Sequence, residues 1–551
     1  MSQEFRLASN FSGPLNFSVG DNYLHYETEE NYYVFINALS AFANWSGKSG
    51  VEETGCLQGF IGLQGGSEGF QNPNPVLGGG EPIQDCVYTD PNPISGLNNY
   101  GHNYFLSQNP YTLNSYAGFG EANYTIASDL KLTGGIRWTE DRKRFIDIPS
   151  EVIAQGYGYY VTGIVNQQWD ELTGRAVANW TPKLDFTDQT LVYGSYARGY
   201  KAGGANPPGA VFTEVPGQGD IAEPIHPLTF RPEFINAYEL GSKNTLLDGA
   251  LTLNGDVFFY DYKAYQISEI VDRTSINLNF NATVKGAELE SSYEPIPGLR
   301  FNFAGGWEDT RIDNGQGAID LMDRTAGTPG WMVIKPFLTQ ASNCIFPDYV
   351  IQAIINEQSG NIMPGNIPGA GSAACGAAYN QLLDPVTGLV YKASPTVGLS
   401  PGGLVPINAP GYPGFDPTNP AINDGEGFTK PLGGNKLPNA PPFTVSFGAQ
   451  YTLPLTQDWA GTLRGDYYWQ DYSWARVFND NPYDRLRGYT NVNLTLIFTN
   501  QNGWQVMLYD KNIFNTTAIT GDFLNSDDSG LTTNVFLTDP KLIGVRVTKN
   551  W

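Results

Sequence analysis

The sequence predicts an all-β fold, a transmembrane antiparallel β-barrel with short turns at one end and long loops at the other. Three observations support this fold class. Apolar and polar residues alternate along most segments of the chain, which is the period of a half-buried strand. The connections between these segments alternate between a short and a long class. The segments also exceed the roughly 5 to 6 residues usual in globular sheets, as tilted barrel staves do.

The alternation can be followed along the chain, with an apolar side chain at every second position of each segment. The apolar faces are Leu130, Leu132, Ile136 and Trp138, then Leu299, Phe301, Phe303 and Trp307, then Phe443, Val445, Phe447, Ala449, Tyr451 and Leu453. Glu288 and Glu290 lie on a polar face, which suits a watery interior. The last segment carries Ile543, Val545, Val547 and Trp551 on one face. Lys549 interrupts that face and is expected to snorkel to the interface.

The connections give the predicted order of the staves. Short turns are expected at 10–14, 127–129, 183–189, 247–250, 295–298, 456–458 and 500–503. Long connections are expected at 37–113, 147–167, 205–232, 268–282, 313–440, 476–488 and 516–540. This division leaves about fifteen strands. Tight turns on one side and long loops on the other are typical of outer-membrane barrels, whose tight side faces the periplasm.

Composition and charge narrow the function classes. The 551 residues include 64 Gly, 37 Pro, 32 Tyr, 30 Phe and 11 Trp, with 16% charged residues, a composition rich in turn formers and poor in helical ion pairs. The net charge is −24, and a nucleic-acid partner requires a basic face. We therefore exclude DNA and RNA as partners.

Hydropathy predicts no membrane-spanning helix, because no apolar run reaches the roughly 18 residues that one needs. Barrel strands need only about 9 to 11 residues with one lipid-facing side, so a membrane location is still open. Residues Met1 to Leu7 show no basic region, apolar region or cleavage site of a signal peptide. The chain is therefore either cytosolic, or its true beginning is missing.

The four cysteines are Cys56, Cys86, Cys344 and Cys375, each in a stretch rich in Gly, Pro or Asn. Pairing of sequence neighbours, Cys56 with Cys86 and Cys344 with Cys375, is the connectivity we favour among three possible ones. Disulfides in long loops indicate an oxidising compartment. No CxxC motif or Cys/His cluster supports a metal site.

We find no catalytic constellation and expect no cofactor. The three histidines, His25, His102 and His226, have no second ligand nearby in the sequence and are interpreted as solvated side chains. Glu288 and Glu290 have a spacing compatible with acid/base catalysis, but lining of the lumen is the interpretation we favour. The glycines of 199–204 lack the helix that a phosphate-binding loop requires.

Six stretches carry patterns that occur together in one family. They are "QEFRLASNFSGPLNFSVGDNYL" from Gln3, "LVYGSYARGYKAGGAN" from Leu191, "PEFINAYELGSKNTLLDGALTLNGDVFFYDYKAYQI" from Pro232, "GAELE" from Gly286, "LPNAPPFTVSFGAQY" from Leu437 and "LYDKNIFN" from Leu508. The second matches the stave pattern Y-x-S-Y-x-x-G-Y-K-x-G-G-x-N and is the most specific. In this order the stretches resemble the TonB-dependent outer-membrane receptors along most of the strand regions.

The resemblance implies a 22-stranded barrel closed by an N-terminal plug, with a preceding box that pairs with TonB. Neither is found before Met1. An odd count of about fifteen strands also places the first strand's N-terminus outside, whereas complete bacterial barrels have an even number. We therefore expect residues 1–551 to be one receptor-like β-barrel domain, N-terminally truncated, without the plug and about seven strands.

The function implied by the resemblance is TonB-dependent active uptake of a scarce solute, not catalysis. The expected partners are the lipid of a Gram-negative outer membrane, a siderophore, oligosaccharide or other small solute, and the TonB complex through the missing plug and box. Loops 37–113 and 313–440 are expected to bind the solute. Aromatic candidates for stacking on it, which otherwise pack the loops, are Trp45, Tyr88, Tyr100, Trp331, Phe337, Tyr379 and Tyr412.

Two other classes stay open. One is a passive porin-like or adhesin-like outer-membrane barrel, which the region upstream of Met1 would distinguish, because a plug and box there mean energised uptake. The other is a secreted all-β carbohydrate-binding or hydrolytic protein. The strict alternation of loop lengths and the closing aromatic stave speak against this second class.

Overall fold

The structure is a computed structural model of the whole chain. It describes residues 1–34, 105–147, 151–152, 163–206, 229–271, 274–334, 343–348, 382–383, 390–391, 396–399, 403–406, 427–525, 531 and 533–550. The architecture is nearly all-β, as predicted. In the described part of the chain, no helix has the length and apolar character that a membrane span needs.

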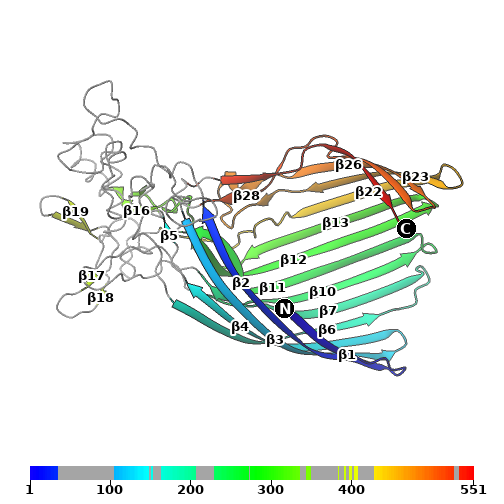
Figure 1. Cartoon of the computed structure of the whole chain (residues 1–551), viewed down its shortest axis with the longest axis horizontal. Helices are drawn as coiled ribbons and strands as arrows, with labels where there is room; N and C mark the ends of the chain where they lie inside the picture. The colour runs from blue at the N-terminus through cyan, green and yellow to red at the C-terminus, as the bar shows by residue number, and fades with distance from the viewer. Residues whose placement is uncertain are drawn as a thin grey trace, which may run out of the picture.

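One large antiparallel sheet dominates the fold, and its strands follow one another in chain order (Figure 1). The path runs through β1 (Ser2–Ala8), β2 (Leu15–Val34), β3 (Phe105–Ala127), β4 (Leu130–Asp147), β6 (Gly163–Trp180), β7 (Gln189–Lys201), β10 (Glu233–Leu246), β11 (Leu251–Val271), β12 (Thr274–Ile296), β13 (Leu299–Ile312), β22 (Phe443–Pro454), β23 (Trp459–Gln470), β26 (Tyr489–Asn500), β27 (Trp504–Lys511) and β30 (Leu542–Lys549). A short strand, β5 (Glu151–Val152), pairs with β3. The predicted count of about fifteen long strands is confirmed.

Tight turns join the strands at one end of the sheet, which we call the turn end (Figure 1). Each predicted short turn falls between two paired strands, and the shortest lie between β3 and β4 and between β12 and β13. Gly298 closes the second of these with φ of +83°, and a Cβ at this position would lie 2.5 Å from the Thr452 carbonyl oxygen. Glycine is therefore required there for both backbone conformation and space.

The opposite end, which we call the loop end, carries the longer connections, and one of the predicted ones is wrong. The long loop expected at 268–282 is replaced by strand, because β11 continues to Val271 and β12 already begins at Thr274. The asparagines of 277–281 suggested a loop. However, Ile276, Leu278 and Phe280 alternate with these asparagines, which is the period of a strand. Other parts of the chain cover the face of β12 on which these three apolar side chains lie. The sheet is therefore taller here than predicted.

Short two-stranded pairs occur within the long connections. They are β8 (Gly204–Ala205) with β9 (Thr229–Phe230), β14 (Gly317–Ile319) with β21 (Thr429–Pro431), β15 (Trp331–Ile334) with β16 (Cys344–Pro347), β17 (Leu382–Leu383) with β18 (Val390–Tyr391), β19 (Thr396–Leu399) with β20 (Gly403–Pro406), β24 (Ser473–Trp474) with β25 (Arg485–Leu486), and β28 (Ile519–Leu524) with β29 (Thr533–Leu537). The predicted loops 313–440 and 516–540 therefore contain local strands.

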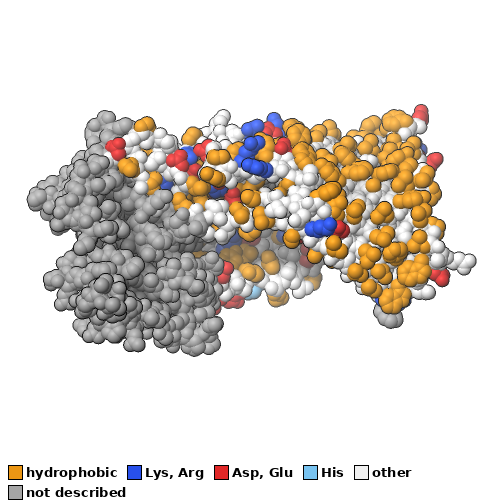
Figure 2. All heavy atoms as spheres, turned by 90° about the horizontal axis from the view of Figure 1, so that it is seen from above, with side chains coloured by type: hydrophobic (Ala, Val, Ile, Leu, Met, Phe, Trp, Pro, Cys, Tyr) orange, Lys and Arg blue, Asp and Glu red, His pale blue; other side chains and the backbone are white. Residues whose placement is uncertain are grey.

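The two faces of the sheet differ in polarity as the alternation predicted. One face exposes large apolar side chains, including Ile136, Leu240 and Leu463, which are 65%, 58% and 60% exposed. Figure 2 shows such side chains as a broad band toward the turn end, away from the grey atoms. We call this the outward face, and the band the apolar band. At its edge the Lys549 ammonium lies over the Trp504 ring, 5.3 Å from the centroid.

The inward face is polar. Arg464 donates to Asp466 Oδ2 at 2.9 Å and to Gln450 Oε1 at 2.9 Å. Glu288 lies on this face too, directly opposite Asp256 of the neighbouring strand, whereas the intervening Leu289 is 44% exposed on the outward face. A polar interior and an apolar exterior are the inverse of a soluble barrel and are typical of a membrane barrel.

Candidate functional site

The candidate site is built where parts of two connections at the loop end, β13–β22 and β23–β26, fold onto the inward face of the extended β12. Phe280, Ala282 and Val284 face this side of β12 at every second position and are 4%, 0% and 8% exposed. The side chains that cover them come from the end of β13 and from these two connections: Ile312, Ala318, Leu432, Leu437, Val477 and Phe478. Burial of this apolar surface fixes the connections against the wall instead of leaving them extended.

Hydrogen bonds between segments far apart in sequence set the register of these connections. The Thr310 hydroxyl of β13 accepts from the Leu437 amide at 2.9 Å. Asn435 Nδ2 donates to the Val477 carbonyl at 2.9 Å, which joins the connection before β22 to the connection after β23. The pairing of β14 with β21 closes the connection on itself. The segments around 320, 430 and 476 are thereby brought together.

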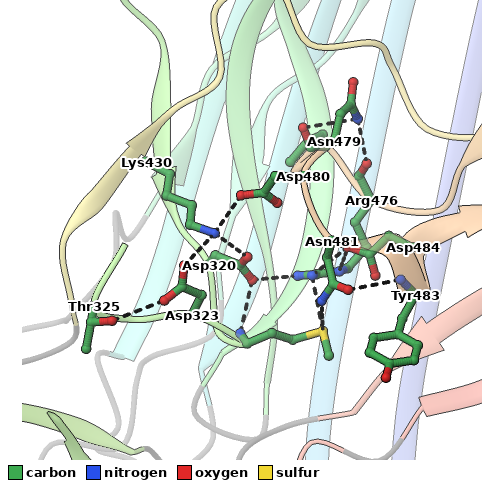
Figure 3. A network of polar contacts seen from close by, with 12 residues as sticks. Asp320, Asp323, Thr325, Lys430, Arg476, Asn479, Asp480, Asn481, Tyr483 and Asp484 are labelled. Carbon is green, nitrogen blue, oxygen red and sulfur yellow. Dashed lines mark hydrogen bonds and ion pairs between the residues drawn. The ribbon is translucent and has the colours of Figure 1, made fainter. Parts of the chain in front are cut away.

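A network of charged side chains lies at this junction, and we call it the mouth network: Asp320, Asp323, Lys430, Arg476, Asp480 and Asp484 (Figure 3). Asp320 is its centre and is 1% exposed. Its Oδ1 accepts from Arg476 Nη1 at 2.8 Å and its Oδ2 accepts from Lys430 Nζ at 3.1 Å. The Met322 amide donates a third hydrogen bond, at 3.0 Å. One carboxylate therefore connects three segments.

The two cations of the network have further acidic partners. Arg476 Nη2 donates to Asp484 Oδ2 at 2.7 Å, and Nε reaches the same oxygen at 3.0 Å. Asp484 ends a 3-10 turn, Pro482–Asp484, that the Asn481 side chain caps by accepting from the Tyr483 amide. Lys430 Nζ also lies 2.9 Å from Asp323 and 2.9 Å from Asp480. These last two carboxylates are 40% and 59% exposed and form the outer rim of the network.

The electrostatic consequences differ among the members of the network. Burial alone would raise the pKa of Asp320, but Arg476 and Lys430 outweigh burial and lower it. Burial opposes the charge of Lys430, yet hydrogen bonds to Asp480, Asp323 and Asp320 raise its pKa. The pKa of Asp484 is raised, because its burial and the nearby Asp320 and Asp480 outweigh Arg476. Asp320 and its two cations are therefore held in their charged forms.

The chemistry that this arrangement offers is attachment, not reaction. The ammonium of Lys430 already occupies the position between three carboxylates where a cation would otherwise sit. Among the described residues, no group of three or more His, Cys, Asp or Glu side chains has metal-binding geometry. Beside the network, Tyr483 is 84% exposed. The network thus holds the loops in place, and its margin presents exposed side chains.

Two of the candidate residues from the sequence lie in the described part of the chain. Trp331 in β15 is 7% exposed and packs edge-on against Phe428, with ring centroids 5.1 Å apart. This placement is that of a side chain that packs a loop. Cys344 in β16 is disulfide-bonded, and its predicted pairing with Cys375 stays a prediction. The other candidates lie outside the described residues: Trp45, Cys56, Cys86, Tyr88, Tyr100, Phe337, Cys375, Tyr379 and Tyr412.

Other residues discussed from the sequence are placed as follows. His25 is the one histidine in the described ranges, and its Nδ1 is 2.9 Å from Asn114 Oδ1. Glu288 and Glu290 share the inward face with Asp256 and Glu239. The Glu239 carboxylate accepts a hydrogen bond from the Tyr193 hydroxyl. The mouth network itself was missed by the sequence reasoning. Its charged residues are isolated in polar loops, and no spacing links 320 to 430 and 476.

Comparisons with known proteins agree with this architecture. The family model described as TonB dependent receptor-like, beta-barrel, matches residues 2–339. A search of curated proteins finds no match to the chain.

Solved structures with the same fold are also found. The ferric yersiniabactin uptake receptor FyuA from Yersinia pestis is similar with a TM-score of 0.55 and 13% identity, over 99% of this chain and 53% of that one. The siderophore receptor PiuA from Acinetobacter baumannii gives a TM-score of 0.50 and 14% identity, over 99% and 55%. The chain therefore spans about half the length of these two proteins.

Proposed function

Because the chain belongs to the TonB dependent receptor-like, beta-barrel family, we propose that it forms the wall and extracellular mouth of an outer-membrane receptor for active solute uptake. The loop end is the extracellular side and binds the solute. The turn end faces the periplasm, where coupling to TonB supplies the energy. The proposed cargo is a ferric siderophore or another scarce nutrient, carried through the polar interior.

The observation that supports this proposal most is the mouth network on the inward face of the wall. A passive pore needs only a polar lumen, and its loops need no fixed position for solutes to diffuse through. Here a buried carboxylate, Asp320, binds Lys430 and Arg476 at the same time. Because breaking a buried ion pair costs several kcal/mol, the loops have a defined shape at the entrance. A receptor requires such a shape in order to select its solute.

The proposal is tested by uptake in cells. The native gene is deleted from its host, and accumulation of a panel of radiolabelled ferric siderophores is measured with and without a functional TonB. We expect deletion to abolish accumulation of at least one member of the panel, and loss of TonB to have the same effect. Accumulation that needs the gene but is independent of TonB would show a passive pore instead. Unchanged accumulation of the whole panel would remove ferric siderophores as the cargo.

The role of the mouth network is tested in the same strain. The gene is returned either as wild type or as Asp320→Asn, with Asp466→Asn as the matched control. Asp466 also pairs with an arginine, but on the lumen wall away from the loops. The receptor proposal predicts weaker solute binding for Asp320→Asn, seen as a higher half-saturating concentration, and wild-type uptake for the control.

A further inference from the structure

The outward face contains a groove that neither the uptake function nor the mouth network explains. It has a volume of about 720 Å³ and crosses β4, β6, β7, β10 and β11 within the apolar band. Its sides are large apolar residues such as Leu132, Leu240 and Val257, which are 39%, 58% and 53% exposed. Its floor is formed by Ala178 and Gly194. A wall that only faced lipid would not need this hollow.

The strand register explains why the groove is open. Leu132 of β4 lies opposite Ala178 of β6, Ala178 lies opposite Gly194 of β7, and Gly194 lies opposite Leu240 of β10. Two small residues therefore stand side by side between two leucines. A Cβ added at Gly194 would meet only Leu240 Cδ1, at 3.9 Å. A straight apolar chain of one methylene width can lie between the leucines without displacing protein atoms.

Polar and cationic groups mark the end of the groove nearest the loop end. Tyr196 and Tyr238 pack against each other with ring centroids 5.1 Å apart and ring planes tilted by 40°, and the Tyr196 hydroxyl donates to Asn236 Oδ1 at 3.0 Å. Arg198 follows on the same face, its guanidinium 4.6 Å from the centroid of the Phe234 ring. Within the described ranges it forms no ion pair, whereas Asp261, farther along this row, is bound by Lys263 at 2.8 Å.

We propose that this groove binds one acyl chain of an anionic, phosphate-bearing lipid of the outer leaflet, whose phosphate is held by Arg198; phosphatidylglycerol is the probe for it. The apolar groove is continuous with the apolar band, so an acyl chain that contacts the band can also lie in the groove. The guanidinium provides the charge complementarity, because Arg binds phosphate oxygens in a bidentate manner. The inference rests on the proposed function only in requiring that the outward face contacts lipid.

The test measures lipid retention by the purified full chain in detergent, using native mass spectrometry. Phosphatidylglycerol and phosphatidylcholine of equal acyl length are titrated separately. We expect the wild type to retain one phosphatidylglycerol at least about tenfold more tightly than phosphatidylcholine, the ratio expected for one charge-assisted contact. Arg198→Gln should lower phosphatidylglycerol retention to the phosphatidylcholine level. Equal retention of the two lipids by the wild type would overturn the proposal.

The acyl part is tested by filling the groove with Ala178→Leu and Gly194→Leu together, which should weaken retention of both lipids about tenfold. Ala449→Leu is the matched control, an outward-facing alanine on β22 outside the groove. Unchanged retention by the filled variant would also overturn the proposal. Thermal unfolding by circular dichroism confirms that each variant folds, and Arg198→Gln keeps the test decisive should the double variant not fold. Flotation with phosphatidylcholine vesicles separately tests whether the chain inserts at all, so a failure of the proposed membrane location is distinguishable.

Discussion

At the scale of single residues, the arrangement of the loop end depends on one buried carboxylate. Asp320 has almost no solvent exposure and binds two cations from segments more than a hundred residues away. A buried charge is costly unless it is paired, so each member of the network restricts the others to this geometry. Single substitutions here should therefore change the loops while leaving the wall intact.

Asp320→Asn is expected to loosen the loops by about 2 kcal/mol, because it removes a charge from two buried ion pairs without changing the side chain's shape. Opening of that size would accelerate tryptic cleavage after Arg476, which Val477 follows, roughly 30-fold. Asp466→Asn, in a pair whose side chains are 30% and 36% exposed, should leave that rate unchanged. Equal cleavage of both variants would contradict a central role for Asp320.

The pH dependence of the loops follows from the direction of the same shift. The pKa of Asp320 in the folded chain lies below its ordinary value of 3.8, so its contribution to stability is complete above that value and is lost as the pH falls through the lowered pKa. The raised pKa of Asp484 has the opposite effect on stability, because burial disfavours its charged form. As the pH falls, Asp484 therefore takes up a proton before Asp320 does. The protection of 427–440 against hydrogen exchange, taken relative to the intrinsic rate at each pH, should stay high from pH 7 to about 4 and fall only below that range. A loss of protection near pH 6 would contradict this assignment.

The residues of the mouth network could not have been found from the sequence. Each is an ordinary charged residue in a loop, and only the folding of two connections onto β12 brings them together. Trp331 illustrates the opposite case, because an aromatic residue in a long loop is a reasonable candidate for solute binding. Its packing against Phe428 became evident only from the structure. The composition of a loop indicates that it is long and irregular, but it does not indicate which of its side chains are buried.

At the scale of elements, β12 is the strand that joins wall and loops. The half of it near the turn end alternates between the apolar band and the lumen, whereas its other half presents Ile276, Phe280 and Ala282 to the loop residues that cover them. The sequence predicted the first half correctly, because lipid-facing residues are large and regular. It missed the second half because asparagines between the apolar positions are equally typical of a loop.

Phe280→Ala is expected to detach the loops from β12 rather than to unfold the sheet. The side chain is 4% exposed, and removing a buried phenyl ring costs about 3 to 5 kcal/mol. Hydrogen exchange in 312–318 and 476–478 should therefore become much faster, while exchange in β22 and β23 stays slow. Phe447→Ala is the control, because this ring is 42% exposed on the outward face and its loss leaves no cavity. Equal effects of the two variants would show that the loops do not depend on β12.

At the scale of the whole molecule, the arrangement is a polar interior, an apolar exterior and two dissimilar ends. These properties follow from alternation and loop length, which is why the sequence alone predicted the fold class and nearly every tight turn. They are averages over many strands, so an error such as that at 268–282 does not change them. The outward band also makes the proposed membrane location testable.

Leu289→Arg should make folding into bilayers less favourable by about 2 to 4 kcal/mol, the cost of a charge on the lipid-facing side near the midplane. Thr283→Arg places the same charge on the same strand and face, beyond the apolar band, and should cost about 0 to 1 kcal/mol. The midpoints of urea-dependent folding into vesicles measure both values. A tolerated arginine at 289 would mean that this face does not contact lipid.

The length of β12 also determines how far the proposed solute entrance lies from the membrane. At roughly 3.3 Å per residue and a tilt of roughly 40°, its 23 residues rise roughly 55 Å along the barrel axis. An apolar band accounts for roughly 25 Å of that height. The rest of β12 raises the entrance roughly 30 Å above the apolar band. In the proposed receptor, a solute would therefore reach the entrance without approaching the bilayer surface.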